Sequence, residues 1–214
     1  IARTTNQGLR DFAAADRGRF RWMATLPMAA PDRVAAVLED AASDGAIGVE
    51  VGTNVVSRRL DDPVYEPFWA AAENLNLPVM LHPAFNEANR GLDDFYFQNV
   101  IGNQLETTIA IERLISAGVL GRHPGLRVVL VHAGGYFPFQ AGRLRHAKTV
   151  RPELENAPVD PWSFFGQVVV DTITHDPATL KYLIERVGRD NVVMGTDLPF
   201  DMAELAKALR IYRL

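Results

Sequence analysis

The chain has 214 residues with a formal net charge of −4, and 48% of its residues are hydrophobic. This composition is ordinary for a globular protein and excludes the strongly basic footprint of a nucleic-acid-binding domain. The chain has no cysteine, so disulfides and thiolate metal sites are excluded and any metal ligand must be a histidine or a carboxylate. No apolar stretch approaches the roughly 20 residues that a membrane-spanning helix needs. No signal peptide is visible either, so we expect a cytoplasmic protein without a membrane partner.

Strand-like and helix-like segments alternate along the chain. A helix is predicted over residues 8–16, and because the chain begins with Ile1 and opens directly into this helix, we expect it to be incomplete at its N-terminus. Several of the following apolar runs are hydrophobic on consecutive residues, which is typical of parallel strands buried on both faces. Six runs are predicted to be strands: residues 21–28, 46–53, 78–83, 127–134, 167–174 and 191–197.

Helices are predicted between these strands, over residues 31–44, 103–117 and 177–187. The last has the clearest ends, with Asp176 as the N-cap, Pro177 as the first helical residue and Gly188 as the stop. Strand–helix alternation predicts an α/β fold with a parallel sheet. An open nucleotide-binding sheet usually carries G-x-G-x-x-G after its first strand, and this motif is absent. A (β/α)8 barrel is therefore favoured, although six strands are two short of closure. The loop over residues 150–163 is long enough to be a lid or a dimer contact.

Three polar side chains stand where apolar strands end. His82 follows Val-Met-Leu, His132 precedes Ala-Gly-Gly, and Asp197 follows Gly-Thr. In a (β/α)8 barrel the carboxyl ends of all strands meet at one mouth, where active sites lie. We therefore interpret His82 as a metal ligand and Asp197 as a metal ligand or acid/base group. The alternatives are a hydrogen-bonded core histidine for His82, a helix N-cap for Asp197 and a purely structural glycine turn after His132.

Other candidates near the same mouth are less specific. Asp171 could orient a metal-bound water or a catalytic imidazole, whereas His175, four residues later, is as readily structural. Arg143 follows the glycine turn and could bind a carboxylate bidentately, with a surface ion pair as its alternative. His123 precedes a strand, at the opposite face, where a role in stability is expected. Aromatic residues near these loops could line a pocket or only pack: Phe85, Tyr96, Phe137 and Phe139.

The segments that carry these residues resemble one enzyme family. "LHPAF", "LVHAGGYFPFQAGRLRH", "DTITHDPATLKYLIERVG" and "NVVMGTDLPF" are similar to the amidohydrolase-related (amidohydrolase 2) family and, within it, to the aminocarboxymuconate-semialdehyde decarboxylase-like branch. The resemblance covers nearly the whole chain. It implies a distorted TIM (β/α)8 barrel, formed as a single domain over residues 1–214, whose first one or two βα units are missing from this chain.

The resemblance also implies roles for individual residues. Members hold one divalent metal ion, usually zinc and in some cases manganese, with a His-x-His pair, a histidine and an aspartate. His82 and Asp197 match the last two ligands, whereas no His-x-His occurs in this sequence. His132 matches the catalytic histidine. Arg143 matches an arginine that holds the substrate carboxylate in a neighbouring subunit, which implies a homodimer. Independently of the resemblance, Phe85 and Tyr96 are expected to contact the substrate because they lie near these loops.

The implied activity is non-oxidative decarboxylation of an unsaturated or aromatic carboxylic acid. The metal would act as a Lewis acid or activate a water, and His132 would move a proton to or from that water or the substrate carbon. The same parts could hydrolyse a lactone or an amide, which is the alternative activity. A catalytically inactive binding or scaffold protein is the third hypothesis, because only two metal ligands are found and catalytic zinc generally has three protein ligands.

Overall fold

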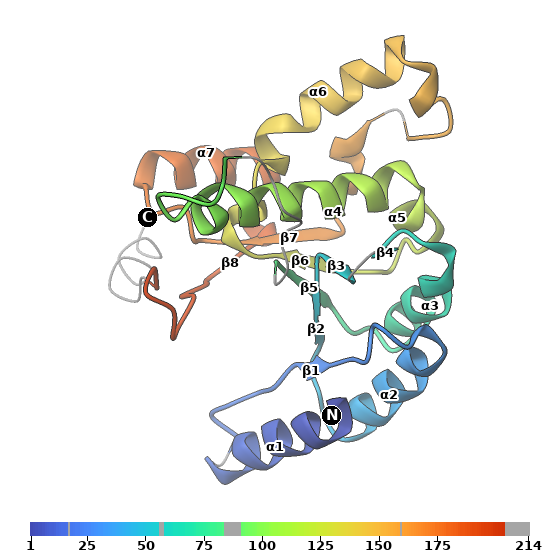
Figure 1. The fold of residues 1–214 in the computed structure, drawn as a ribbon, viewed down its shortest axis with the longest axis vertical. Coiled ribbons are helices and arrows are strands. Elements are labelled where there is room, and N and C mark those ends of the chain that lie inside the picture. Colours follow the sequence, from blue (N-terminus) through green and yellow to red (C-terminus); the bar gives the residue numbers. More distant parts are fainter. Residues whose placement is uncertain (17, 56–57, 84–90, 159, 204–214) are drawn as a thin grey trace.

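The computed structural model describes residues 1–214 with the exception of residues 17, 56–57, 84–90, 159 and 204–214 (Figure 1). Six parallel strands form its main sheet, in the order β1-β2-β5-β6-β7-β8. Their bounds are Ala24–Thr25 (β1), Val49–Gly52 (β2), Val79–His82 (β5), Val128–Leu130 (β6), Val168–Asp171 (β7) and Val192–Val193 (β8). All six predicted strands are confirmed, and so is the parallel α/β arrangement. The described residues form an open sheet rather than a closed barrel.

Helices connect the strands, with bounds Ala2–Ala15 (α1), Pro31–Ser43 (α2), Glu66–Asn74 (α3), Gln104–Ser116 (α4), Val119–Arg122 (α5), Phe137–Val150 (α6) and Pro177–Val187 (α7). The ends of α7 are as predicted, because the Asp176 side chain accepts a hydrogen bond from the Thr179 backbone N–H and Gly188 follows the last turn. α6 projects away from the sheet (Figure 1). The loop after it contains two short 3₁₀ helices, Pro152–Leu154 (η4) and Pro161–Phe164 (η5).

Two of the short elements that were not predicted lie near the functional candidates. A two-stranded antiparallel hairpin, Asn54–Val55 (β3) and Arg58–Arg59 (β4), follows β2 directly. A π-helix, Gln98–Asn103 (η2), leads into α4. The hairpin lies just beyond the carboxyl end of β2, and the π-helix comes after β5 and directly before α4. Both elements are therefore on the side of the sheet where the functional candidates lie.

The two faces of the sheet have different surroundings. Val49, Val79 and Val128 are fully buried and belong to a hydrophobic core shared with the helices. Their neighbours Glu50, Met80 and Val129 pair in register across β2, β5 and β6 and point to the opposite face. That second face is covered less completely, and its side chains line a cavity. The sheet therefore has one packed face and one face that is available for a site.

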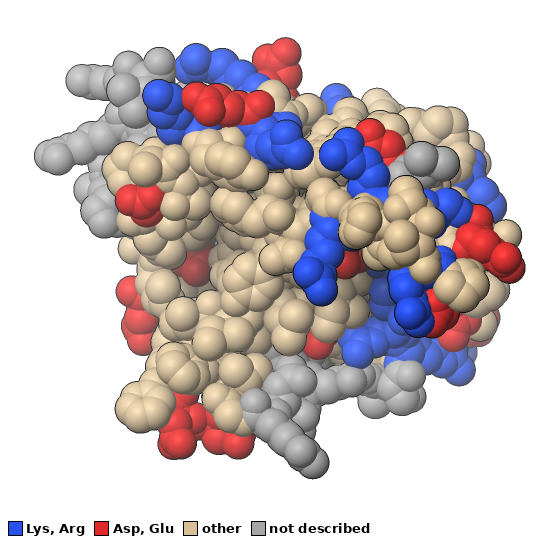
Figure 2. Space-filling view, turned by 90° about the horizontal axis from the view of Figure 1, so that it is seen from above, with Lys and Arg blue, Asp and Glu red and all other residues tan. Residues whose placement is uncertain are grey.

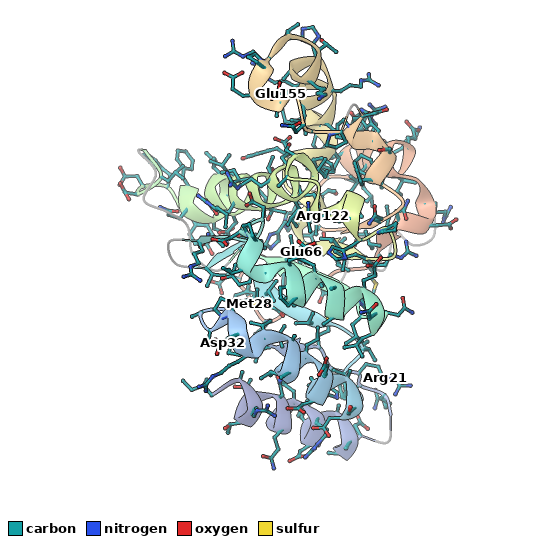
Figure 3. All side chains as sticks on the ribbon, turned by 90° about the vertical axis from the view of Figure 1, so that its right-hand side faces the viewer. Arg21, Met28, Asp32, Glu66, Arg122 and Glu155 are labelled. Carbon is teal, nitrogen blue, oxygen red and sulfur yellow. The ribbon has the colours of Figure 1, made fainter. Side chains whose placement is uncertain are left out.

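The amino-terminal side of the sheet is held by an ion-pair network, part of which Figure 3 labels. His123 is buried, with Nδ1 2.9 Å from Oε2 of Glu73 and Nε2 3.0 Å from Oε1 of Glu66. Arg122 donates two hydrogen bonds to the Glu66 carboxylate, at 2.9 and 2.8 Å. Because these side chains tie α3 and α5 together, away from the cavity-lining residues, the structural role expected for His123 agrees with its contacts.

The surface of the described residues carries mixed charges. In the face shown in Figure 2, Lys and Arg side chains are interspersed with Asp and Glu rather than gathered into one basic stripe. Among the residues that the structure describes, no helix combines the length and the apolar composition needed to cross a membrane.

Candidate active site

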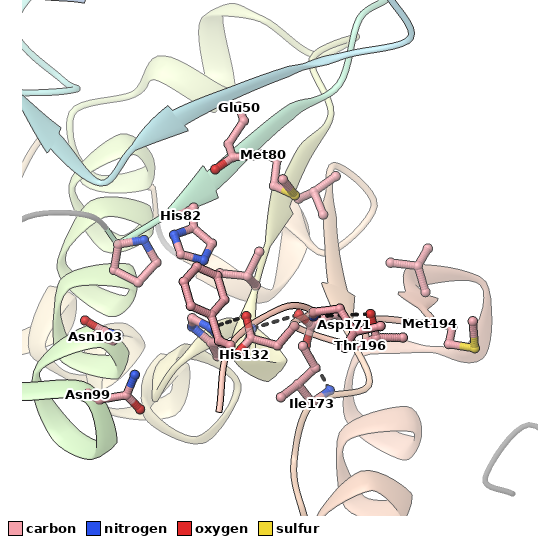
Figure 4. Close-up of a pocket in the computed structure, with 18 residues that line it drawn as sticks. Glu50, Met80, His82, Asn99, Asn103, His132, Asp171, Ile173, Met194 and Thr196 are labelled. Atoms are coloured by element: carbon pink, nitrogen blue, oxygen red, sulfur yellow. Dashed lines mark hydrogen bonds and ion pairs between the residues drawn. The ribbon is translucent and has the colours of Figure 1, made fainter. Parts of the chain in front are cut away.

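A cavity of about 620 Å³ opens at the carboxyl ends of the parallel strands (Figure 4). His82 ends β5, Asp171 ends β7, and His132 and Asp197 follow β6 and β8. All four side chains line this cavity. Residues that are far apart in the sequence therefore meet at one place, as expected for the active-site end of a parallel β/α fold.

His82, His132 and Asp197 form the centre of the site. One ligand atom of each side chain lies within 4.8 Å of those of the other two, which is close enough for the three to share one metal ion. The imidazole rings of His82 and His132 meet edge to face, with 5.4 Å between centroids. Nε2 of His132 lies 3.8 Å from Oδ1 of Asp197. Imidazole nitrogen together with carboxylate oxygen is a common donor set for zinc and other divalent transition metals.

The backbone around His132 adopts an unusual turn. His132 and Ala133 both have positive φ angles, 53° and 58°. Residues other than glycine, asparagine and aspartate rarely adopt this backbone conformation. The Asp171 carboxylate accepts hydrogen bonds from the backbone N–H groups of His132 (2.9 Å), Ala133 (2.7 Å) and Ile173 (2.9 Å). Asp171 therefore holds the backbone that carries His132. Its role in orienting a metal-bound water or a catalytic imidazole stays a prediction.

Asp171 is almost completely buried, with 5% of its surface exposed. Burial raises its pKa from 3.8 to about 6, although the three backbone N–H groups act in the opposite direction and the nearby Asp197 adds to the rise. Desolvation is thus the larger effect. Near neutral pH the carboxylate still carries its charge and can accept all three hydrogen bonds.

His132 is buried beside both other members of the cluster. Burial lowers its pKa, Asp197 raises it, and His82 lowers it again, with a net shift below the usual value. The imidazole is therefore neutral at neutral pH and has a free lone pair for a metal ion or a proton. Its Nδ1 atom is buried without a hydrogen-bond partner among the described residues. A buried nitrogen left unpaired next to a histidine and a carboxylate fits a site built for a metal ion.

Gly134 and Gly135 complete the turn with φ angles of 78° and 62°. A Cβ atom on Gly135 would lie 2.4 Å from the Gln104 carbonyl oxygen and 2.9 Å from Oγ1 of Thr108. The glycines therefore allow the turn to approach α4, and neither of them lines the cavity. This supports the structural interpretation of the glycine turn.

Three of the other predicted site residues, Arg143, His175 and Tyr96, lie outside the cavity lining. Arg143 is exposed on α6, and His175 is exposed beyond β7 with a left-handed backbone. Tyr96 is 60% exposed, and Phe85 lies outside the described residues. Of the remaining aromatic candidates, Phe137 is fully buried in the core and Phe139 stacks on Tyr182.

Four polar residues of the cavity lining were not predicted as site residues: Glu50, Asn99, Asn103 and Thr196. Glu50 stands between two buried valines on β2, and a carboxylate in the middle of an apolar strand is the signal that could have identified it. Asn99 and Asn103 lie on η2, and no local pattern in the sequence marks a π-helix.

Together, the fold and the cluster define a parallel β/α protein with a candidate metal site of two histidines and one aspartate at its strand ends. The amidohydrolase family model matches residues 1–208. The chain belongs to this family, which confirms the resemblance inferred from the sequence.

Characterised relatives and solved structures are similar along nearly the whole chain. The 2-amino-3-carboxymuconate-6-semialdehyde decarboxylase of Dictyostelium discoideum is 32% identical over 96% of this chain and 58% of its own length. The gamma-resorcylate decarboxylase of Rhodococcus jostii is 31% identical over 94% of this chain and 67% of its own length. A dihydroxybenzoic acid decarboxylase from Polaromonas, solved with manganese and 2-nitroresorcinol, superposes with a TM-score of 0.88 at 26% identity, covering 100% of this chain and 68% of that chain. This chain thus spans only part of the length of these relatives.

Proposed function

We propose that this chain contributes the active site of a metal-dependent non-oxidative decarboxylase that acts on an aromatic or unsaturated carboxylic acid. The cluster of His82, His132 and Asp197 inside the strand-end cavity is the observation that carries the proposal. The decarboxylase activities of the similar enzymes from Dictyostelium and Rhodococcus support the choice of reaction.

A divalent ion would be held by His82 and Asp197 and would supply a Lewis acid for substrate oxygens. We propose zinc as the native ion, with manganese as the second choice, since the similar Polaromonas enzyme was solved with manganese. Asp171 would keep the His132 turn in place through its three backbone hydrogen bonds.

The proton is the part of the reaction that we assign to His132. In decarboxylation the bond between the substrate carbon and its carboxylate breaks, carbon dioxide leaves with neither gain nor loss of a proton, and the carbon takes up one proton. His132 is neutral at neutral pH because of its burial, so it can accept a proton from the solvent and deliver that proton to the carbon, which returns the imidazole to its neutral form.

Arg143 lies outside the cavity of its own chain, exposed on the projecting helix α6. We therefore propose that it acts in a second copy of the protein, where it would hold a substrate carboxylate, and that the enzyme is a homodimer. Light scattering should give the mass of a dimer for both the purified wild-type protein and Arg143→Ala. The kinetics of carbon dioxide release should give a raised KM for Arg143→Ala. A cytoplasmic location remains a prediction that cell fractionation can check.

The test of the proposed function is carbon dioxide release from a panel of aromatic and unsaturated carboxylic acids by the metal-loaded protein. His132→Ala should abolish release while the protein retains its metal, because the variant removes the proton carrier but leaves His82 and Asp197. Loss of the metal in His132→Ala would instead make His132 a ligand. Opening of a lactone ring or an amide without carbon dioxide release would show that the protein is a hydrolase rather than a decarboxylase. An absence of turnover with every metal tested would favour the inactive scaffold.

A further inference from the structure

The segment that carries Asp197 leaves the sheet before it reaches the site. β8 ends at Val193, which pairs with Asp171 at the end of β7. Asp197 follows four residues later, so the regular hydrogen bonds of the sheet do not position it. Within the described part of the chain, the only ion pair or hydrogen bond of its carboxylate is the 3.8 Å contact with Nε2 of His132. The backbone before Asp197 must therefore set where this carboxylate lies.

The side chain of Thr172 holds that backbone where the strand pairing stops. Its Oγ1 atom accepts a hydrogen bond from the Gly195 N–H at 3.2 Å and donates one to the Gly195 carbonyl oxygen at 3.5 Å. In a continued parallel sheet, backbone groups of the neighbouring strand would bond to these two groups. A hydroxyl can replace them because it is both a donor and an acceptor. Thr172 is only 7% exposed, so it fixes the main chain from a buried position two residues before Asp197.

Close packing keeps this contact in place. A Cβ atom on Gly195 would lie 2.9 Å from Cβ of Asp171, so the Gly195 backbone rests directly on the Asp171 side chain. Asp171 also accepts the hydrogen bond from the His132 backbone N–H at 2.9 Å (Figure 4). Two consecutive residues at the end of β7 thus hold the two backbones of the central pair: Asp171 holds that of His132, and Thr172 holds the segment leading to Asp197.

We propose that Thr172 is a positioning residue that places the Asp197 carboxylate for metal binding beside His82. Metal sites need their ligands within about 0.5 Å of the productive geometry, and one atom of each member of the cluster already lies within 4.8 Å of the others. Thr172 does not belong to the cavity lining, so it acts through the backbone rather than on the metal or the substrate. The proposal rests on the proposed function in taking Asp197 as a metal ligand.

Zinc affinity tests the proposal without requiring turnover. The metal-free protein is titrated with zinc in competition with a chromophoric chelator at neutral pH. Thr172→Val, which has nearly the same shape but lacks the hydroxyl, should bind zinc about 2- to 12-fold more weakly than the wild type, the range that corresponds to one lost hydrogen bond. Thr172→Ser retains the hydroxyl and should bind zinc with wild-type affinity.

Thr107→Val is the matched control, because it separates positioning from a general loss of stability. Thr107 is also buried, and its hydroxyl donates a hydrogen bond to the Asn103 carbonyl oxygen at 3.1 Å. The control loses this bond, so its urea midpoint should fall while its zinc affinity stays that of the wild type. Thr172→Ala replaces Thr172→Val where circular dichroism shows that the valine variant is not folded.

The outcomes separate this proposal from the proposed function. Wild-type zinc affinity in Thr172→Val, an equal loss of affinity in Thr172→Ser, or an equal loss in Thr107→Val overturns the role of Thr172. A wild-type protein that binds no zinc overturns both this role and the metal site. An affinity that depends on the hydroxyl, in a protein that releases no carbon dioxide from any acid, supports the role of Thr172 and overturns the reaction alone.

Discussion

Replacing Gly135 by alanine should destabilise the protein far more than an ordinary glycine substitution. The backbone at Gly135 has a φ angle of 62°, and an added Cβ would lie 2.4 Å from the Gln104 carbonyl oxygen. It would also crowd Oγ1 of Thr108, which accepts a hydrogen bond from the Tyr136 N–H at 2.8 Å and donates one to Gln104 O at 2.8 Å. The turn and α4 therefore have no direction in which to separate without losing these bonds.

The magnitude follows from two contributions. A non-glycine residue in a disfavoured backbone region costs about 1–3 kcal/mol, and overpacking a close contact costs about 1–3 kcal/mol. The free energy of unfolding of Gly135→Ala should thus fall by about 2–6 kcal/mol, and His132, three residues earlier, should be displaced from the site.

Urea unfolding of the metal-free protein measures the effect, with Gly142→Ala as the matched control. Gly142 lies in α6, where an added Cβ meets nothing within 4 Å, and alanine in a helix interior is favoured over glycine by roughly 0.5–1 kcal/mol. The control should therefore be slightly more stable than the wild type. A Gly135→Ala variant as stable as the wild type would refute the account of the turn.

Two further predictions concern pH. Because the pKa of Asp171 is raised to about 6, the native state binds this proton before the unfolded state does, so the metal-free protein should gain on the order of 1 kcal/mol from this group between pH 7 and pH 5. In Asp171→Asn, urea unfolding should show no such gain. The pKa values of Glu66 and Glu73 are lowered, first by their hydrogen bonds with Arg122 and His123 respectively. The stabilisation from both carboxylates is present above pH 4.5 and is lost as the pH falls through their lower native pKa values. The urea concentration at the midpoint of unfolding, measured from pH 6 to pH 3, should therefore fall less steeply with acid in Glu73→Gln than in the wild type. An equally steep fall in the variant would contradict the role of this network.

The strand positions could be predicted from the sequence because each buried strand is a short apolar run of its own. β5 and β7 illustrate this, since Val79–His82 and Val168–Asp171 coincide with runs that are apolar until the last residue. The ends of α7 were equally readable, because the cap at Asp176 is a local interaction with Thr179. Signals confined to a few neighbouring residues were therefore sufficient for the architecture.

The details of the site were not readable, because distant residues impose them. The left-handed backbone of His132 is held by Asp171, which lies 39 residues further along the chain. The π-helix that presents Asn99 has no local signature, and Glu50 faces the cavity only because β2 pairs with β5 in one particular register. The sequence identified His82, His132 and Asp197 as candidates, whereas their convergence within 4.8 Å required the assembled sheet.

Metal content is the most direct measurement of the central claim that His82, His132 and Asp197 form a metal-dependent site. The metal-free protein would be incubated with zinc or manganese at neutral pH, dialysed and analysed by inductively coupled plasma mass spectrometry. The account predicts about one ion per chain in the wild type, loss of that ion in His82→Ala and Asp197→Ala, and full retention in His146→Ala, whose side chain is exposed on α6. A wild-type protein that holds no ion, or a His82→Ala variant that retains it, would contradict the account.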